Sequence, residues 1–239
     1  MLKHRLQFQI ARQPDETTCG PTCLEAIYRY YNDALPLDQL IREVPSLDDG
    51  GTLGVLLACH ALRRGYRAAL YPYNLQLFDP TWFDLDRHAL ESKLRSQAEH
   101  KERSKLRFAT AAFLEFLELG GELRFADLSP RLIRRLLGHD QPLLTGLSAT
   151  YLYRTPREFG PEADYDDVRG EPSGHFVVLC GFEPRSQRVL VADPLHPNPF
   201  AETQLYAVNV DRLITAILLG VLTYDAVLLL LEPSRRRPG

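Results

Sequence analysis

The sequence predicts an α+β protein, in which a helical amino-terminal part packs on a mainly antiparallel carboxy-terminal sheet. Up to about residue 138, apolar residues recur mostly at the spacing of helices that bury one face. Beyond that point the chain holds short runs of aliphatic and β-branched residues separated by turn residues, which is the pattern of strands. Helices first and strands after are typical of the α+β class.

Length, composition and charge limit the kinds of protein that this chain can be. Its 239 residues, 45% hydrophobic and 25% charged, can bury a core, and we expect one domain over residues 1–239 with a helical, partly charged insertion at about 80–140. The formal charge of −3 leaves no excess of cations, so we expect no nucleic acid and no membrane as a partner. The first 16 residues lack the apolar run of a signal peptide, which favours a cytoplasmic protein with free thiols.

Three helices are predicted in the first third of the chain. Residues 21–31 place apolar side chains at four helical positions, so Leu24, Ile27, Tyr28 and Tyr31 are expected in the core. A second helix begins at residue 36 and ends before a proline at residue 45. The third follows a polar, glycine-containing turn and is closed by Gly65.

The middle and the end of the chain predict further helices and then strands. Charges of both signs dominate residues 86–107, which indicates a solvated helix or a mobile excursion. Helices are expected over 109–120 and 129–138, the latter with Ser129 as its cap and Pro130 at the first helical position. Strands are expected at 142–149, 175–182, 188–193, 204–210 and 224–231, with a helix capped by Asp211 and ended by Gly220 before the last of them.

Cys19 stands where polar sequence gives way to the first helix. A thiol attacks a carbonyl carbon as the thiolate, and the unpaired N–H groups at the amino end of a helix stabilise that anion. Pro21 suits the first helical turn, and Gly20 would let the backbone of a substrate come close to the sulfur. The pattern therefore indicates a nucleophile, although most free cysteines are simply small buried residues.

A nucleophilic thiol needs a base, and the base needs a group that orients it. His175 opens one predicted strand and Asp193 closes the next, so a hairpin of these strands would bring the two side chains to the same end. A strand-end ion pair without a catalytic role is the alternative. Gln13, six residues before Cys19, offers a side-chain N–H donor for the oxyanion that forms during the attack. The order Cys, His, Asp is that of the papain class.

Four stretches together resemble a known family: "QPDETTCGPTCLEAIYRYY", "GGTLGVLLACHALRRGY", "GHFVVLCGF" and "VLVADP". They look like those of the bacterial papain-like cysteine peptidases related to the double-glycine leader peptidases of bacteriocin exporters. The resemblance, over about residues 8–75 and 141–200, implies a papain-like fold with the catalytic triad Cys19, His175 and Asp193 and with Gln13 as oxyanion donor. The helical segment at 80–140 is longer than the family domain, and the sequence contains no transporter, so the resemblance does not make a double-glycine leader the substrate.

These observations predict a cysteine peptidase or amidohydrolase that cleaves a peptide or related amide through a thioester acyl-enzyme. We expect a peptide or protein as its substrate, and neither a cofactor nor a metal. An acyl transferase that uses the same triad, or a non-catalytic peptide-binding module on this scaffold, would carry the same residues. Residues 150–174 show no helical or strand pattern and contain several acids, which indicates either a lid that favours a cationic substrate or a disordered loop.

Overall fold

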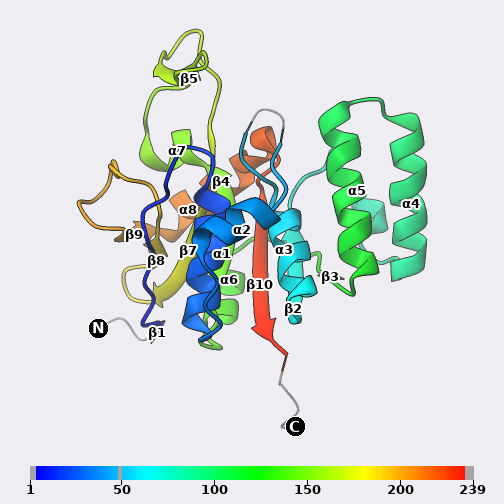
Figure 1. Ribbon diagram of the computed structural model, residues 1–239, viewed down its shortest axis with the longest axis horizontal. Coiled ribbons are helices and arrows are strands. Elements are labelled where there is room, and N and C mark those ends of the chain that lie inside the picture. Colours follow the sequence, from blue (N-terminus) through cyan, green and yellow to red (C-terminus); the bar gives the residue numbers. More distant parts are fainter. Residues whose placement is uncertain (1–3, 48–49, 235–239) are drawn as a thin grey trace.

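The computed structural model describes residues 4–47 and 50–234, which form a sheet between two layers of helices (Figure 1). Two positions of the predicted glycine-containing turn, 48 and 49, lie outside the described residues. The helices are α1 (Cys19–Tyr30), α2 (Leu37–Glu43), α3 (Gly54–Arg63), α4 (Arg87–His100), α5 (Ser104–Glu118), α6 (Pro130–Leu137), α7 (Ala149–Tyr153) and α8 (Val210–Leu219), with 3₁₀ turns η1 (Pro80–Trp82) and η2 (Gly220–Thr223). The strands are β1 (His4–Arg5), β2 (Tyr66–Pro72), β3 (Glu122–Leu123), β4 (Leu143–Ser148), β5 (Glu158–Phe159), β6 (Asp164–Tyr165), β7 (Gly174–Glu183), β8 (Arg188–Ala192), β9 (Leu205–Asn209) and β10 (Val227–Pro233).

The main sheet has the strand order β3-β2-β10-β4-β7-β8-β9, and β1 pairs with β7 in addition. Every pairing in it is antiparallel except that of β2 with β3. Strands β5 and β6 form a separate two-stranded sheet. Helices packed on a mainly antiparallel sheet confirm the predicted α+β class.

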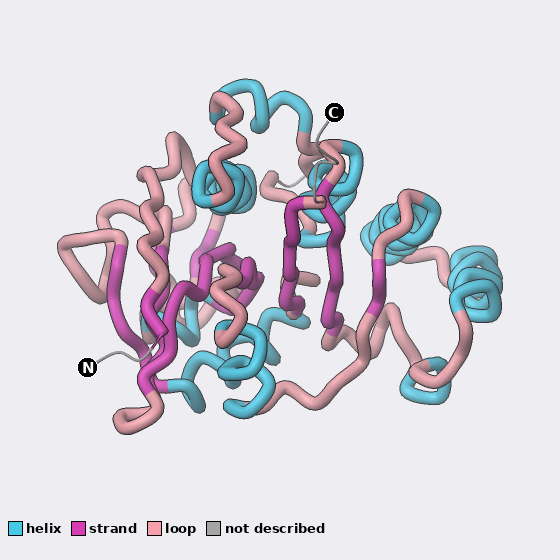
Figure 2. The backbone as a smooth tube through the Cα atoms, turned by 90° about the horizontal axis from the view of Figure 1, so that it is seen from below, coloured by secondary structure: helices cyan, strands magenta, loops and turns pink. Residues whose placement is uncertain are grey.

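Both faces of the main sheet are covered by helices (Figure 2). Along β7, Phe176 and Val178 belong to the core that includes the apolar residues of α1, α3 and α5. Val177 and Leu179 belong to a second core, which α6, α7 and α8 complete. Because neighbouring residues of a strand face opposite sides, the nearly unbroken apolar run of β7 is what a strand buried on both faces requires.

All five predicted strands are present as β4, β7, β8, β9 and β10, and the predicted helices of the first third are present as α1, α2 and α3. The prediction missed β2, which follows Gly65 directly and pairs with β10 along its whole length. Its two alanines and its proline have a low tendency to form strands. The segment is therefore a strand because of its pairing with β10 rather than because of its own residues.

Two local predictions need correction. Asn209, not Asp211, caps α8, because the Asn209 side chain accepts hydrogen bonds from the N–H groups of Asp211 and Arg212. Tyr31 is only half-buried, since α1 ends one residue before it and its hydroxyl donates to the carbonyl of Leu231. Ser129 and Pro130 begin α6 as predicted.

The charged segment at 86–107 forms α4 and the start of α5, a helix pair that lies beside the β3 edge of the sheet (Figure 1). Its leucines Leu90, Leu94 and Leu106 are buried in the same core as α3, while most of its charged residues are exposed. The segment is therefore helical, with one face packed on the core and its charged residues in solvent. No helix in the described part of the chain combines the length and the apolar character needed to span a membrane.

Candidate active site

Cys19 is the first residue of α1, and only 7% of its surface is exposed. Its backbone N–H is therefore one of the donors that a helix leaves without an intrahelical partner at its amino end. Gly20 is buried, and a Cβ atom there would lie 2.7 Å from Cγ2 of Thr52. The close packing of α1 against the Thr52 segment is thus a reason for glycine at this position, and the predicted access of a substrate backbone stays a prediction.

Cys23, one helical turn after Cys19, attaches α1 to the sheet. Its thiol donates a hydrogen bond to the carbonyl of Phe176, with 3.2 Å between sulfur and oxygen. Burial, together with the negative charges of Cys19 and Asp193, raises the pKa of Cys23 well above its ordinary value, so it remains a thiol. The bond ends at the residue after His175, so it links the helix that carries Cys19 to the strand that carries His175.

The β7–β8 hairpin brings His175 and Asp193 together. In its register Leu179 lies opposite Val191, so His175 and Asp193, each an even number of residues from this pair, lie on the same face at the same end. Nε2 of His175 lies 2.9 Å from Oδ1 of Asp193, and both side chains are buried. This contact occupies Nε2 and leaves Nδ1 for the sulfur of Cys19.

Two tyrosines complete the environment of Asp193. The hydroxyls of Tyr153, from α7, and Tyr206, from β9, each donate to Oδ2 of Asp193 over 2.6 Å. The N–H of Leu195 donates to Oδ1 over 2.9 Å. Neither tyrosine is marked by the sequence, because Tyr153 lies in the segment without a pattern and Tyr206 occupies an ordinary strand position.

The electrostatics favour an ion pair between the imidazole and the carboxylate. Burial by itself lowers the pKa of His175, but the charges of Asp193 and Cys19 and hydrogen bonds to both raise it to about 10. Burial by itself raises the pKa of Asp193, yet the charge of His175 and the hydrogen bonds from His175, Tyr153 and Tyr206 lower it. At neutral pH, His175 is therefore an imidazolium and Asp193 a carboxylate.

Gln13 lies next to this group but is oriented differently from the prediction. Its backbone N–H donates to the carbonyl of Pro194 over 2.9 Å, which places the Gln13 segment beside Asp193. Its side-chain Nε2 donates to the carbonyl of Asp15 over 2.9 Å, and Oε1 is buried without a partner among the described residues. The structure thus brings Cys19, His175 and Asp193 together, while the Gln13 amide is hydrogen-bonded within its own loop.

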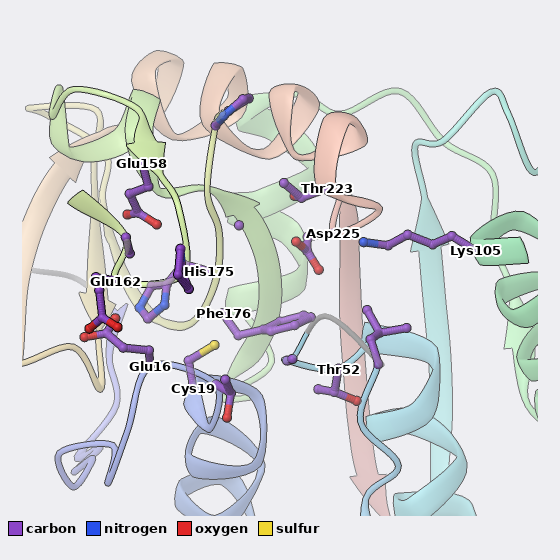
Figure 3. Close-up of a pocket in the computed structure, with 18 of the residues that line it drawn as sticks. Glu16, Cys19, Thr52, Lys105, Glu158, Glu162, His175, Phe176, Thr223 and Asp225 are labelled. Carbon is purple, nitrogen blue, oxygen red and sulfur yellow. The ribbon is translucent and has the colours of Figure 1, made fainter. Parts of the chain in front are cut away.

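A cavity of about 790 Å³ opens above Cys19 and His175 (Figure 3). Residues 150–174, predicted to be a lid or disordered, form α7 and the β5–β6 hairpin, and the hairpin supplies one wall of the cavity. Glu16, Glu158 and Glu162, which we call the acidic wall, lie on this side, and none of them forms an ion pair with a described residue. On the opposite side Lys105 extends from α5 toward Asp225 (Figure 3).

The cavity has no evident metal site. Among the described residues, no three His, Cys, Asp or Glu side chains are grouped so that they could hold a metal ion. All four cysteines are free and buried. The chemistry that the cavity offers is that of a thiol beside an imidazolium, with acidic side chains on one wall.

Comparison with known protein families bears on the amino-terminal part of this site. Residues 7–82 match the model of the Peptidase C39 family, a range that includes Gln13 and Cys19 and ends before His175 and Asp193. No curated protein shows a significant match to the chain. The match confirms the resemblance to the leader peptidases over that range and the predicted class of enzyme, a cysteine peptidase.

Solved structures with a similar chain path include three peptidases. A double glycine motif protease from an AMS/PCAT transporter, in complex with the leader peptide, has 13% identity over 97% of this chain and 96% of that chain, with a TM-score of 0.46. The peptidase domain of Streptococcus ComA has 12% identity over 95% of this chain and 100% of that chain, with a TM-score of 0.46. Xylellain, a cysteine protease from Xylella fastidiosa, has 13% identity over 98% of this chain and 88% of that chain, with a TM-score of 0.44. Residues 7–82, which match the Peptidase C39 family, include the cysteine at the amino end of α1. On the basis of that family match, the protein is a cysteine peptidase.

Proposed function

We propose that this cysteine peptidase cleaves a peptide or related amide bond through a thioester acyl-enzyme, with Cys19 as the nucleophile, His175 as acid and base, and Asp193 as the group that orients His175. The observation that supports the proposal most directly is the position of the three side chains. A thiol at a helix amino end adjoins a buried imidazolium at the floor of a 790 Å³ cavity, and the imidazolium is hydrogen-bonded to a carboxylate.

The first half of the reaction follows from these positions. The imidazolium of His175 stabilises the thiolate of Cys19, whose sulfur attacks the carbonyl carbon of the substrate. When the tetrahedral intermediate collapses, the C–N bond breaks and Nδ1 of His175 gives its proton to the leaving amine. The products of this half are a thioester on Cys19 and a neutral imidazole.

Water completes the reaction in the second half. His175 takes a proton from a water molecule, the oxygen attacks the thioester carbon, and the C–S bond breaks to release the acid and restore the thiolate. The backbone N–H of Cys19 would donate to the oxyanion in both halves. We include Gln13 as the second donor, and in that role its amide exchanges the carbonyl of Asp15 for the oxyanion.

The acidic wall favours a substrate with a positive charge near the bond that is cut. Glu16, Glu158 and Glu162 come from two separate segments, and uncompensated carboxylates that line one side of a cavity attract a cationic group. We therefore infer a peptide or protein substrate with a lysine, an arginine or a free amino terminus close to the cleavage site.

We also propose how the chain is organised and where in the cell it acts. We infer that residues 1–239 act as one peptidase domain, and that the helices between about 80 and 140 are an insertion whose contribution to the cavity is Lys105. Four free, buried cysteines are consistent with the reducing conditions of the cytoplasm, which we propose as its location.

Incubation of a cell-peptide mixture with the wild-type protein and with Cys19→Ala tests the proposal. Mass spectrometry should find new peptide ends only with the wild type, and a thioester adduct on Cys19 when the reaction is stopped with acid. Added primary amines distinguish a transferase, because amide products would then exceed hydrolysis products. Equal peptide patterns from both proteins, together with peptide binding, would leave the non-catalytic binding module instead.

A further inference from the structure

Asp193 is a buried carboxylate whose four acceptor positions are all used. A carboxylate offers about four lone-pair sites. Tyr153 and Tyr206 donate to Oδ2 over 2.6 Å, and the Leu195 N–H and His175 Nε2 lie 2.9 Å from Oδ1. Only one of these four partners is His175, so three donors hold the carboxylate whatever proton the imidazole has gained or lost.

The two carboxylate oxygens of Asp193 have different partners. Oδ1 accepts from His175, which belongs to the proposed chemistry, whereas Oδ2 accepts only from the two tyrosine hydroxyls. Tyr153 and Tyr206 come from two separate elements, α7 and β9. Donors fixed on two elements determine the plane of the carboxylate, and the plane determines where Oδ1 points.

Phe200 covers the two tyrosines. Its ring centroid lies 5.7 Å from that of Tyr153 and 5.2 Å from that of Tyr206. Arg212 packs on the ring of Phe200, with Cζ 4.7 Å from the ring centroid. Asp193 itself has no exposed surface. Water cannot replace a lost hydroxyl there without a rearrangement, so each tyrosine hydroxyl matters to the charge of the carboxylate.

We propose that Tyr153 and Tyr206 are positioning residues that act through Asp193: together they keep its buried carboxylate ionised and its Oδ1 aligned on His175. The inference rests on the proposed function only in treating Cys19, His175 and Asp193 as one site. It adds two residues that neither touch the substrate nor belong to the triad.

The protonation states fit this role. Burial, followed by the charge of Asp193, raises the pKa of Tyr153 and of Tyr206 well above 10, so both hydroxyls remain donors. Loss of one donor removes a hydrogen bond that favours the charged form of Asp193, and its pKa must rise. The titratable or charged groups that face Asp193 and its two tyrosines are Cys19 and Cys23 from α1, His175 from β7 and Arg212 from α8.

The test follows the ring signals of His175 by nuclear magnetic resonance as a function of pH, in the full-length wild type, Tyr153→Phe, Tyr206→Phe and the double variant, and measures how fast iodoacetamide alkylates Cys19 at neutral pH. His175 stays protonated on the acid side, so the change in its signals there reports the proton that Asp193 gains. We expect the acid-side midpoint to move to higher pH, by about half to one pH unit in each single variant and by more in the double variant. Tyr28→Phe is the matched control, because it loses a buried hydroxyl that bonds His60 instead, and its midpoint should not move.

Thermal unfolding of each variant separates this role from a purely structural one. If the two single variants lose stability as Tyr28→Phe does but keep the wild-type pH profile, the proposal is overturned. The single variants suffice if the double variant does not fold. Because no peptide is used, a wild type whose Cys19 shows no preferential alkylation contradicts the proposed function, whereas unshifted profiles on a reactive Cys19 contradict only the tyrosine roles.

Discussion

Replacing Asp193 by asparagine removes a charge from the site while nearly preserving the shape of the side chain. The asparagine oxygen can still accept from Leu195 and His175, so the strand end and the contact to the imidazole can persist. The charge that raises the pKa of His175 is lost, however, whereas the burial that lowers it remains. Activity should therefore fall through the protonation of His175 rather than through unfolding.

The size of the effect follows from the pKa of His175. At a pKa of about 10 nearly all of the imidazole is protonated at pH 8. If the pKa returns to the ordinary 6.5, only about one molecule in thirty is protonated at that pH. We expect peptide cleavage at pH 8 to fall about 30-fold, with a smaller loss near pH 6, and Asp193→Ala to lose more because it also removes the orienting contact.

Nuclear magnetic resonance of histidine-labelled protein follows the titration of His175 directly, beside cleavage rates at several pH values and the melting temperature. Asp33→Asn is a suitable control, because Asp33 also accepts from a tyrosine hydroxyl and pairs with Arg64 instead of a histidine. The reasoning is refuted if His175 titrates at the same pH in the wild type and in folded Asp193→Asn. Full activity in folded Asp193→Ala would remove Asp193 from the site.

Four further predictions concern Cys19, the His175–Asp193 pair, the acidic wall and the charged segment. At pH 6–7 iodoacetamide should alkylate Cys19 much faster than the other three cysteines, as peptide mapping would detect, because only Cys19 adjoins an imidazolium; equal labelling would contradict this. The His175–Asp193 pair should stabilise the fold most between pH 3.8 and 6.5, and denaturant titrations should show this contribution falling below that range as Asp193 gains its proton and above it toward pH 10 as His175 loses its own. Glu162→Gln should reduce cleavage of lysine- or arginine-containing peptides about two- to fivefold relative to neutral ones, and an unchanged ratio would argue against the acidic wall. Leu94→Ala should destabilise the protein by about 2–5 kcal/mol, measured by denaturant unfolding, since this side chain of the charged segment is fully buried.

The triad could be anticipated because each member lies at the end of an element that the sequence marks clearly. Cys19 precedes the apolar periodicity of α1, and His175 and Asp193 bound two apolar runs joined by a short turn. Local pattern and hairpin geometry are enough to bring such ends together. Whether the three act as a catalytic site is still a prediction, for which the experiments above are designed.

Features that depend on tertiary contacts could not be anticipated. Strand β2 contains two alanines and a proline and exists because β10 pairs with it. The β5–β6 hairpin lies in a segment whose residues show neither the helical nor the strand period. The two tyrosines are separated from Asp193 by 40 and 13 positions, and no sequence period connects them. The orientation of the Gln13 amide depends on a local competition for the carbonyl of Asp15, which spacing from Cys19 cannot reveal.

Asp193 shows why the structural and the functional interpretation of one residue need not exclude each other. Asp193 precedes Pro194, a position where an aspartate favours a turn, and it is also the partner of His175. In the structure a single oxygen, Oδ1, accepts both the N–H of Leu195 and the contact from Nε2 of His175. The turn therefore helps to aim the atom that the imidazole uses, and a substitution that relaxes the turn should also disturb the site. Asp193→Asn is informative for this reason: it can retain both bonds to Oδ1, so the effect that remains is that of the charge and of the two tyrosine hydroxyls at the other oxygen.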